Sequence, residues 1–364
     1  GGTPDNPSIA LTGTLADGTL ATYPVNNVKL DAALANRVLT IRQLAGAQGT
    51  GGFSVVGTVD FDGMTNVDIA ASDIALGLFT KFAGVEEPVA GTATLTAHIG
   101  GYTQNPEADV HLMAKDGGMR GNSFDELLGE ARLRNSIIDL QQLVVTKYID
   151  GVRYMASAHG TLPLRALTAA RDEKLSAYEQ LDLTVVLDNA DLSLLPVFSK
   201  YVEWALGHTE GTLKLHGTLA APRLDGMVRV ADGALKIKYL ENPITDMQLQ
   251  VDALGDAIVL RTCTGRMGDG TYTMTGRMEL NGTELTKYDA TLVMNALAIK
   301  TSFFEGPLNG SLHLTEGEYW GEKLPKIVGN IDLDRALISI PSIPDTNDEL
   351  PHIILDVDLN VDRH

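Results

Sequence analysis

The sequence repeats itself, and this repetition constrains the fold more than any other feature. Segments 25–63 (VNNVKLDAALANRVLTIRQLAGAQGTGGFSVVGTVDFDG) and 244–282 (ITDMQLQVDALGDAIVLRTCTGRMGDGTYTMTGRMELNG) align without a gap over their whole length. Each contains a polar break, an apolar stretch, a glycine-rich turn and a stretch that ends in glycine. Segment 124–164 is a looser third copy. Such repetition indicates units stacked in series rather than the two or three separate domains that length alone would suggest.

A second recurring phrase divides the chain. The stretch 211–234, GTLKLHGTLAAPRLDGMVRVADGA, has counterparts that begin at Gly91 and Gly310. These starting points predict a partial β repeat over 1–90, full repeats over 91–210 and 211–309, and the start of a further repeat over 310–364. The polar composition of 165–180 indicates an inserted loop. Segments near 74–83 and 195–206 carry apolar residues at helical spacing and predict short helices that cap the sheet.

Apolar and polar residues alternate along every predicted strand. Successive side chains of a strand point to opposite faces, so this alternation predicts a sheet with one apolar and one polar face. We expect an all-β fold: an elongated, curled antiparallel β-sheet (a repeating β-groove, or β-taco) with an apolar inner face and a few short capping helices. The residues expected to line the apolar face are Leu95, Ala97, Leu183, Val185, Leu187, Leu213, Leu215, Leu249, Val251, Leu292, Met294, Leu312, Leu314, Leu355 and Val357.

The apolar face has to be covered, and the sequence leaves three ways open. A second sheet would form a sandwich, and a sheet that closes on itself would hide the face inside. A sheet that curls into an open groove would leave the face to a ligand or a helix, because large apolar surfaces are rarely exposed without a purpose. Open-ended repetition favours an elongated object over a closed one.

The composition restricts the class of partner. The net charge is −19, from 28 Lys and Arg against 47 Asp and Glu. This balance argues against nucleic acid, which selects basic surfaces, and against docking on an anionic membrane face. Aromatic residues make up only 5% of the chain, so we expect an aliphatic core and an acidic, solvated polar face.

Signatures of catalysis and metal binding are missing from the sequence. Cys263 is the only cysteine, which excludes an intrachain disulfide and a cysteine-cluster metal site. His98, His216 and His313 lie at polar positions of the alternating pattern, but at different distances along the chain from the glycine that opens each repeat phrase. HExxH spacing does not occur. The sequence contains no GxSxG, P-loop or dinucleotide-binding motif. It also contains no signal peptide and no apolar window of about 18 residues. We therefore predict no metal, no cofactor and no enzymatic activity.

The strand phrases resemble those of a known family. The run G-T-L-x-L-x-G-T-L, a proline-containing turn and then G-x-V-x-V-x-D-G resembles the AsmA-like superfamily, specifically the TamB proteins of diderm bacteria. The clearest matches are 211–234 and 310–340. The resemblance implies a periplasmic protein held in the inner membrane by an N-terminal helix, with a long apolar β-groove. We expect this chain to be a fragment that lacks the anchor, because it begins with two glycines and stops while strand 353–361 is still in pattern.

The resemblance also implies a function. Family members are implicated in moving phospholipid to the outer membrane and in outer-membrane protein assembly, often with a BamA-type barrel partner. The expected activity is conduction of phospholipid acyl chains along the groove between the two membranes. Two alternatives stay open: a scaffold for the assembly of outer-membrane proteins by strand addition, and a structural tether whose groove is filled by its own side chains.

Overall fold

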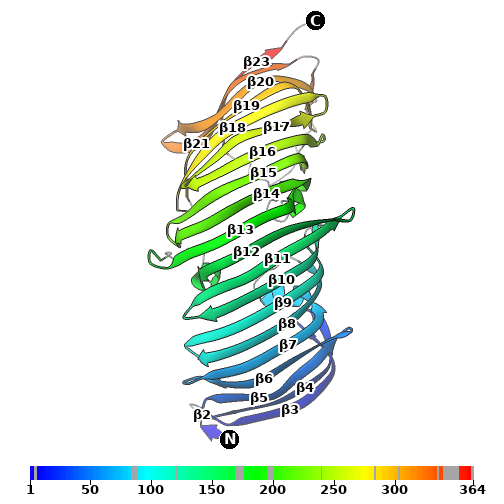
Figure 1. Ribbon diagram of the computed structural model, residues 1–364, viewed down its shortest axis with the longest axis vertical. Coiled ribbons are helices and arrows are strands. Elements are labelled where there is room, and N and C mark those ends of the chain that lie inside the picture. The colour runs from blue at the N-terminus through cyan, green and yellow to red at the C-terminus, as the bar shows by residue number, and fades with distance from the viewer. Residues whose placement is uncertain are drawn as a thin grey trace. The chain divides into compact units, whose positions relative to one another are not determined.

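The computed structural model describes residues 1–3, 6–82, 88–119, 122–168, 176–194, 201–238, 240–282, 284–301, 304–333, 336–338 and 352–361. Strands dominate these ranges, and the predicted all-β class with a curled antiparallel sheet is confirmed (Figure 1). The chain divides into two compact units, residues 1–175 with 179–185, and residues 176–178 with 186–364. The division falls inside strand β13 (Gln180–Asp191). Each unit is described by itself.

Unit 1 is an antiparallel meander. Its strands are β3 (Ile9–Leu20), β4 (Tyr23–Ala35), β5 (Val38–Gln48), β6 (Gly51–Asp60), β7 (Thr65–Ala75), β8 (Val89–Tyr102), β9 (Asn105–Met119), β10 (Asn122–Arg134), β11 (Ile137–Ile149) and β12 (Val152–Pro163). Each pairs antiparallel with the next along the chain. A separate two-stranded ribbon, β1 (Gly2–Thr3) with β2 (Asn6–Pro7), precedes them. Two short helices, α1 (Leu76–Phe82) and α2 (Arg165–Thr168), interrupt the strands.

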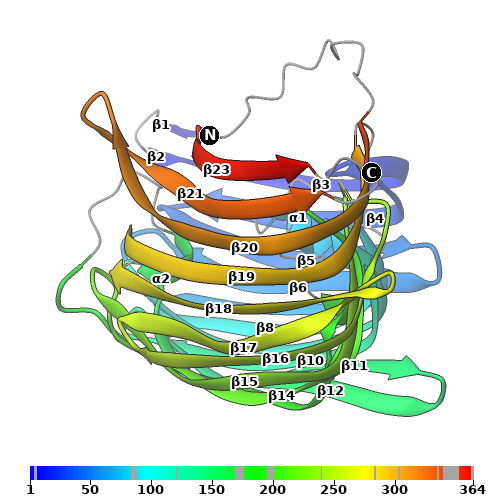
Figure 2. The same cartoon turned by 90° about the horizontal axis from the view of Figure 1, so that it is seen from above.

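Unit 2 repeats this architecture. Its long strands are β14 (Val202–Thr218), β15 (Pro222–Ile237), β16 (Ile244–Gly255), β17 (Ala257–Met267), β18 (Gly270–Asn281), β19 (Glu284–Lys300), β20 (Phe304–Tyr319) and β21 (Glu322–Leu333). They form an antiparallel meander whose strands bend into U shapes (Figure 2). The short β22 (Leu337–Ile338) pairs with β20. The strand expected over 353–361 is β23 (Ile354–Val361), but it pairs parallel with β21, so antiparallel pairing is the wrong prediction for this strand.

Irregularities in the strand register recur in all three copies of the repeat. The register shifts between Asp31 and Ala32 in β4, with matching shifts at 130/131 in β10 and 250/251 in β16. It shifts again between Ile41 and Leu44 in β5, with matching shifts at 140/143 in β11 and 260/263 in β17. A β-bulge bends its strand and increases the local twist. The curvature of each sheet therefore follows from bulges at the same places in every copy.

The two predicted capping helices have different outcomes. The helix expected over 74–83 is α1, which begins at Leu76 because residues 74 and 75 still belong to β7. The helix expected over 195–206 is wrong for residues 202–206, which belong to β14, while 195–200 lie outside the described residues. Val202, Trp204 and Ala205 pair with the end of β15, and this cross-strand pairing overrides a helical spacing of apolar residues. No helix in the described part of the chain is long and apolar enough to span a membrane.

Candidate functional site: the apolar face of each unit

Strand register sorts the expected lining residues of unit 2 into rows. Directly paired residues of neighbouring strands share a face, so a row can be followed from strand to strand. The first row, from β15 to β23, is Val228, Val251, Leu260, Gly276, Ala290, Leu314, Ile327 and Leu355. The second is Val230, Leu249, Cys263, Met274, Leu292, Leu312, Gly329 and Val357. Both rows contain only aliphatic, sulfur-bearing or glycine residues.

The remaining expected residues of unit 2 lie beside these rows. Met294 follows Leu292 on the same face of β19 and pairs with Tyr272 and Gly310. Leu213 and Leu215 lie on β14 opposite Gly226 and Leu224. We call the surface formed by these rows the apolar face of unit 2.

Unit 1 has an equivalent apolar face. One row crosses ten strands from β3 to β12: Gly13, Leu30, Leu44, Val55, Ile69, Ala97, Val110, Ala131, Leu140 and Gly160. Leu95 lies in the adjacent row, paired with Ala71 and Leu112. A Cβ atom added to Gly160 would lie 2.9 Å from the Cα of Leu183, so the row continues onto β13. Val185 and Leu187 share the parity of Leu183 on that strand.

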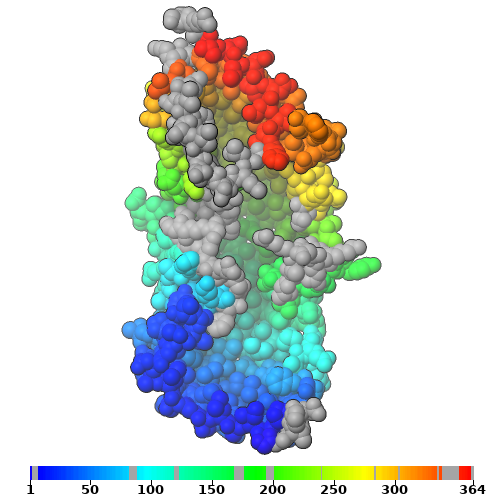
Figure 3. All heavy atoms as spheres, turned by 180° about the vertical axis from the view of Figure 1, so that it is seen from behind, coloured from blue at the N-terminus to red at the C-terminus, as the bar shows by residue number. Residues whose placement is uncertain are grey.

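Most of the expected lining side chains are neither fully buried nor fully exposed. Of the fifteen expected lining residues, Met294 is buried at 6% exposure, Leu355 is exposed at 71%, and the others are half-buried. The sheet of each unit is hollowed on the side opposite to the view of Figure 1 (Figure 3). Half-buried aliphatic residues on a hollowed surface leave apolar area in contact with water, and covering that area would be favourable.

Helix α1 covers part of the apolar face in unit 1. Leu76 packs in one cluster with Ala93 and Ala114, and Leu78 packs with Ala71 and Ile74. Alanines on the sheet let the helix approach the strands closely. The expectation that this helix packs on the sheet is therefore met by specific contacts.

The apolar face of unit 2 is filled at one place by its own residues. Met267, Tyr272, Met294 and Leu297 form a buried cluster, and Leu240 from the β15–β16 connection packs against it. Cys263 Sγ lies 3.7 Å from Tyr272 Oη at the margin of this cluster. Burial raises the pKa of both groups above their ordinary values, so the thiol is a poor nucleophile here.

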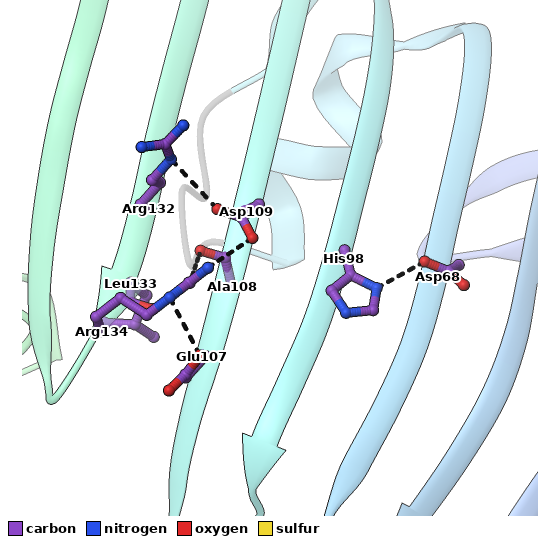
Figure 4. Close-up of polar contacts among 8 residues, drawn as sticks. All are labelled: Asp68, His98, Glu107, Ala108, Asp109, Arg132, Leu133 and Arg134. Carbon is purple, nitrogen blue, oxygen red and sulfur yellow. Dashed lines mark hydrogen bonds and ion pairs between the residues drawn. The ribbon is translucent and has the colours of Figure 1, made fainter.

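The opposite face carries cross-strand ion pairs. Asp68, His98, Asp109 and Arg132 stand directly opposite one another on β7, β8, β9 and β10 (Figure 4). His98 Nδ1 lies 2.8 Å from Asp68 Oδ1, and Arg132 Nε lies 3.5 Å from Asp109 Oδ1. Arg134 donates a 2.7 Å hydrogen bond to Asp109 Oδ2, and this bond lowers the pKa of Asp109. Because Asp68, His98 and Arg132 are exposed and Asp109 and Arg134 are only half-buried, the pairs contribute little stability. They make this face a solvated one.

Sequence reasoning missed the apolar-face residues of β5, β11 and β17, because a bulge interrupts the alternation in each of these strands. In β5 the apolar parity changes between Ile41 and Leu44, and strict alternation would assign everything beyond to the wrong face. The signal is a pair of consecutive polar residues inside the strand: Arg42-Gln43, Gln141-Gln142 and Arg261-Thr262 in the three copies. The bulge lets the strand skip this pair, so that Leu44, Leu143 and Cys263 return to the apolar face.

The arrangement offers an extended surface rather than a reactive centre. Among the described residues, no group of three or more His, Cys, Asp and Glu side chains is placed to hold a metal ion. The predicted polar-face histidines His98, His216 and His313 each contact an aspartate on a neighbouring strand. The comparisons with known proteins add no further assignment: no family model, no curated protein and no solved structure matches the chain.

Proposed function

We propose that the apolar face of each unit binds the acyl chains of phospholipids and conducts them between the inner and outer membranes. In this proposal the chain is part of a periplasmic protein of the TamB and AsmA-like type, as the strand phrases suggest. One observation carries it: rows of aliphatic, sulfur-bearing and glycine residues, most of them half-buried, cross β3 to β12 in unit 1 and β15 to β21 and β23 in unit 2 without a charged side chain. A surface built to be filled by its own side chains would bury them.

The physical basis is the transfer of methylene groups out of water. Each buried CH₂ contributes about 0.8 kcal/mol, so an acyl chain gains several kcal/mol even on a surface that covers only one side of it. The binding needs no specific polar contact. It needs an aliphatic surface that continues from strand to strand, and the head group can stay in water at the ends of the strands.

The decisive experiment uses two neighbouring residues of β19 that point to opposite faces. Leu292 lies on the apolar face, and Val293 lies on the polar face at 48% exposure. The wild-type protein and the variants Leu292→Arg and Val293→Arg are purified without detergent, and bound phospholipid is quantified by mass spectrometry. We expect wild type and Val293→Arg to retain phospholipid and Leu292→Arg to retain several-fold less.

Thermal unfolding followed by circular dichroism shows whether each variant is folded. A folded Leu292→Arg protein that retains as much phospholipid as wild type would refute the proposal. So would a wild-type protein that neither carries phospholipid nor takes up a spin-labelled phospholipid from vesicles.

One observation favours the scaffold as a second candidate. Among the described strands of unit 1, β3 pairs with β4 alone, and its Ile9, Leu11 and Leu15 side chains are 49–56% exposed. An unpaired strand edge is a template for strand addition. A photo-crosslinking residue at Thr12 of β3 should then capture a BamA-type barrel protein or a nascent barrel strand, and it should not do so if the sheet acts only on lipid.

A further inference from the structure

The hairpin between β20 and β21 ends in two exposed aromatic residues. Trp320 is 92% exposed and Tyr319 is 60% exposed, and their ring centroids lie 6.1 Å apart. Large aromatic side chains contribute to folding by burial. At this exposure, the Trp320 ring gains almost nothing from burial and the Tyr319 ring gains only part of what a buried ring would.

The backbone gives no reason for tryptophan at this tip. Trp320 has φ +53° and Gly321 has φ +81°, as in the two-residue hairpin turns that favour Asn, Asp and Gly. Comparable tips carry Asn36, Asn135 and Asp150 at the same φ of 50–53°. A bulky side chain with positive φ is unfavourable, so Trp320 is costly both in conformation and in exposure.

We propose that this hairpin tip inserts into the lipid–water interface of a bilayer and there aligns the apolar face of unit 2 with the membrane. The inference rests on the proposed lipid function and names where a lipid would enter. Tryptophan and tyrosine favour the interface because one part of each ring system is apolar and the other forms hydrogen bonds. The tip also ends a strand whose Leu308, Leu312 and Leu314 belong to the apolar face.

The charges around the tip select the type of bilayer. Glu318 and Glu322 flank the aromatic pair. The Nζ atom of the nearby Lys323 lies 3.6 Å from Oε2 of Glu316. With a net charge of −19, the protein is repelled from an anionic surface, which would attract basic residues. The matching surface is zwitterionic, such as phosphatidylcholine or phosphatidylethanolamine.

The two tryptophans allow a direct test. Trp204, at 37% exposure, is replaced in Trp204→Phe so that Trp320 alone reports. On adding phosphatidylcholine vesicles we expect a blue shift of its emission, several-fold weaker quenching by iodide, and quenching by lipids brominated on the acyl chain. The control Trp320→Ser, which keeps Trp204, should show none of these changes and should cosediment with vesicles several-fold less.

Further variants separate this inference from the proposed function. Leu292→Arg should lose retained phospholipid and still give the Trp320 response, whereas Trp320→Ser should retain phospholipid and lose vesicle binding. An unchanged Trp320 emission at millimolar phosphatidylcholine overturns the inference even if the protein carries lipid. A response to phosphatidylglycerol vesicles alone also overturns it, as does crosslinking of the tip to a protein without any lipid response.

Discussion

Gly310 provides the sharpest test of how closely the strands of the curled sheet approach one another. It lies on the apolar face of β20 with φ +139°, a conformation almost restricted to glycine. A Cβ atom at this position would lie 2.1 Å from the carbonyl oxygen of Asn330 on β21. Gly310→Ala therefore forces both a change of backbone conformation and a displacement of the neighbouring strand.

The two effects can be estimated separately. A non-glycine residue in such a conformation costs about 1–3 kcal/mol. Relieving the Cβ contact requires a backbone shift of about 1 Å, which costs a further 1–3 kcal/mol by analogy with overpacked cores. We expect Gly310→Ala to lower the free energy of unfolding of unit 2 by about 2–6 kcal/mol.

Two other glycines separate these contributions. Gly321 has φ +81° and nothing within 4 Å of an added Cβ, so Gly321→Ala reports conformational strain alone, about 1–2 kcal/mol. Gly13 on β3 has neither constraint, and Gly13→Ala should be neutral or stabilise unit 1 by up to about 1 kcal/mol. Urea unfolding followed by circular dichroism measures all three. If Gly310→Ala costs no more than Gly321→Ala, the close approach of β20 and β21 is not what requires glycine.

Three further predictions follow from burial and charge. Met294→Ala should lower the free energy of unfolding by about 2–5 kcal/mol, and Val293→Ala, on the exposed face, by less than about 1 kcal/mol in the same urea titration. Because its pKa is lower in the folded state, Asp109 stabilises the fold above its ordinary pKa of about 4, and this stability is lost as the pH falls through the pKa of the folded state. Arg134→Met should raise the folded-state pKa of Asp109 in an NMR titration. An unchanged pKa would contradict the role of this ion pair. Cys263 should react with a disulfide reagent at pH 8 more slowly than a free thiol, since burial raises its pKa; a rate equal to that of free cysteine would show that the apolar face opens there.

Much of the fold was accessible from the sequence because a single rule governs it. In a sheet with one wet face, alternation fixes which side chains share a face, and it holds over short strand segments such as those containing Leu213 and Leu249. The face assignment needs no knowledge of the partner strand. For that reason the face of each such residue could be predicted from isolated phrases of the sequence.

The features that escaped prediction depend on pairing between strands. A bulge is a property of two strands, and only the polar pairs such as Arg42-Gln43 mark it in one of them. Residues 202–206 have helical spacing yet pair with β15, and β23 lies parallel to β21, because pairing energy between distant segments outweighs local preference. The role of the alanines beneath α1, which is to let the helix pack closely on the sheet, likewise cannot be predicted before the position of the helix is known.

The matching bulges imply that bending is a local property of each copy and does not depend on how many copies there are. Neighbouring strands lie about 4.8 Å apart, so each hairpin widens the sheet by about 10 Å and returns the chain to the same rim. Duplication of one hairpin would leave every other pair of strands in register and every rim on its original side. The width of such a sheet can thus be adjusted in whole hairpins during evolution, without redesign of the residues already present.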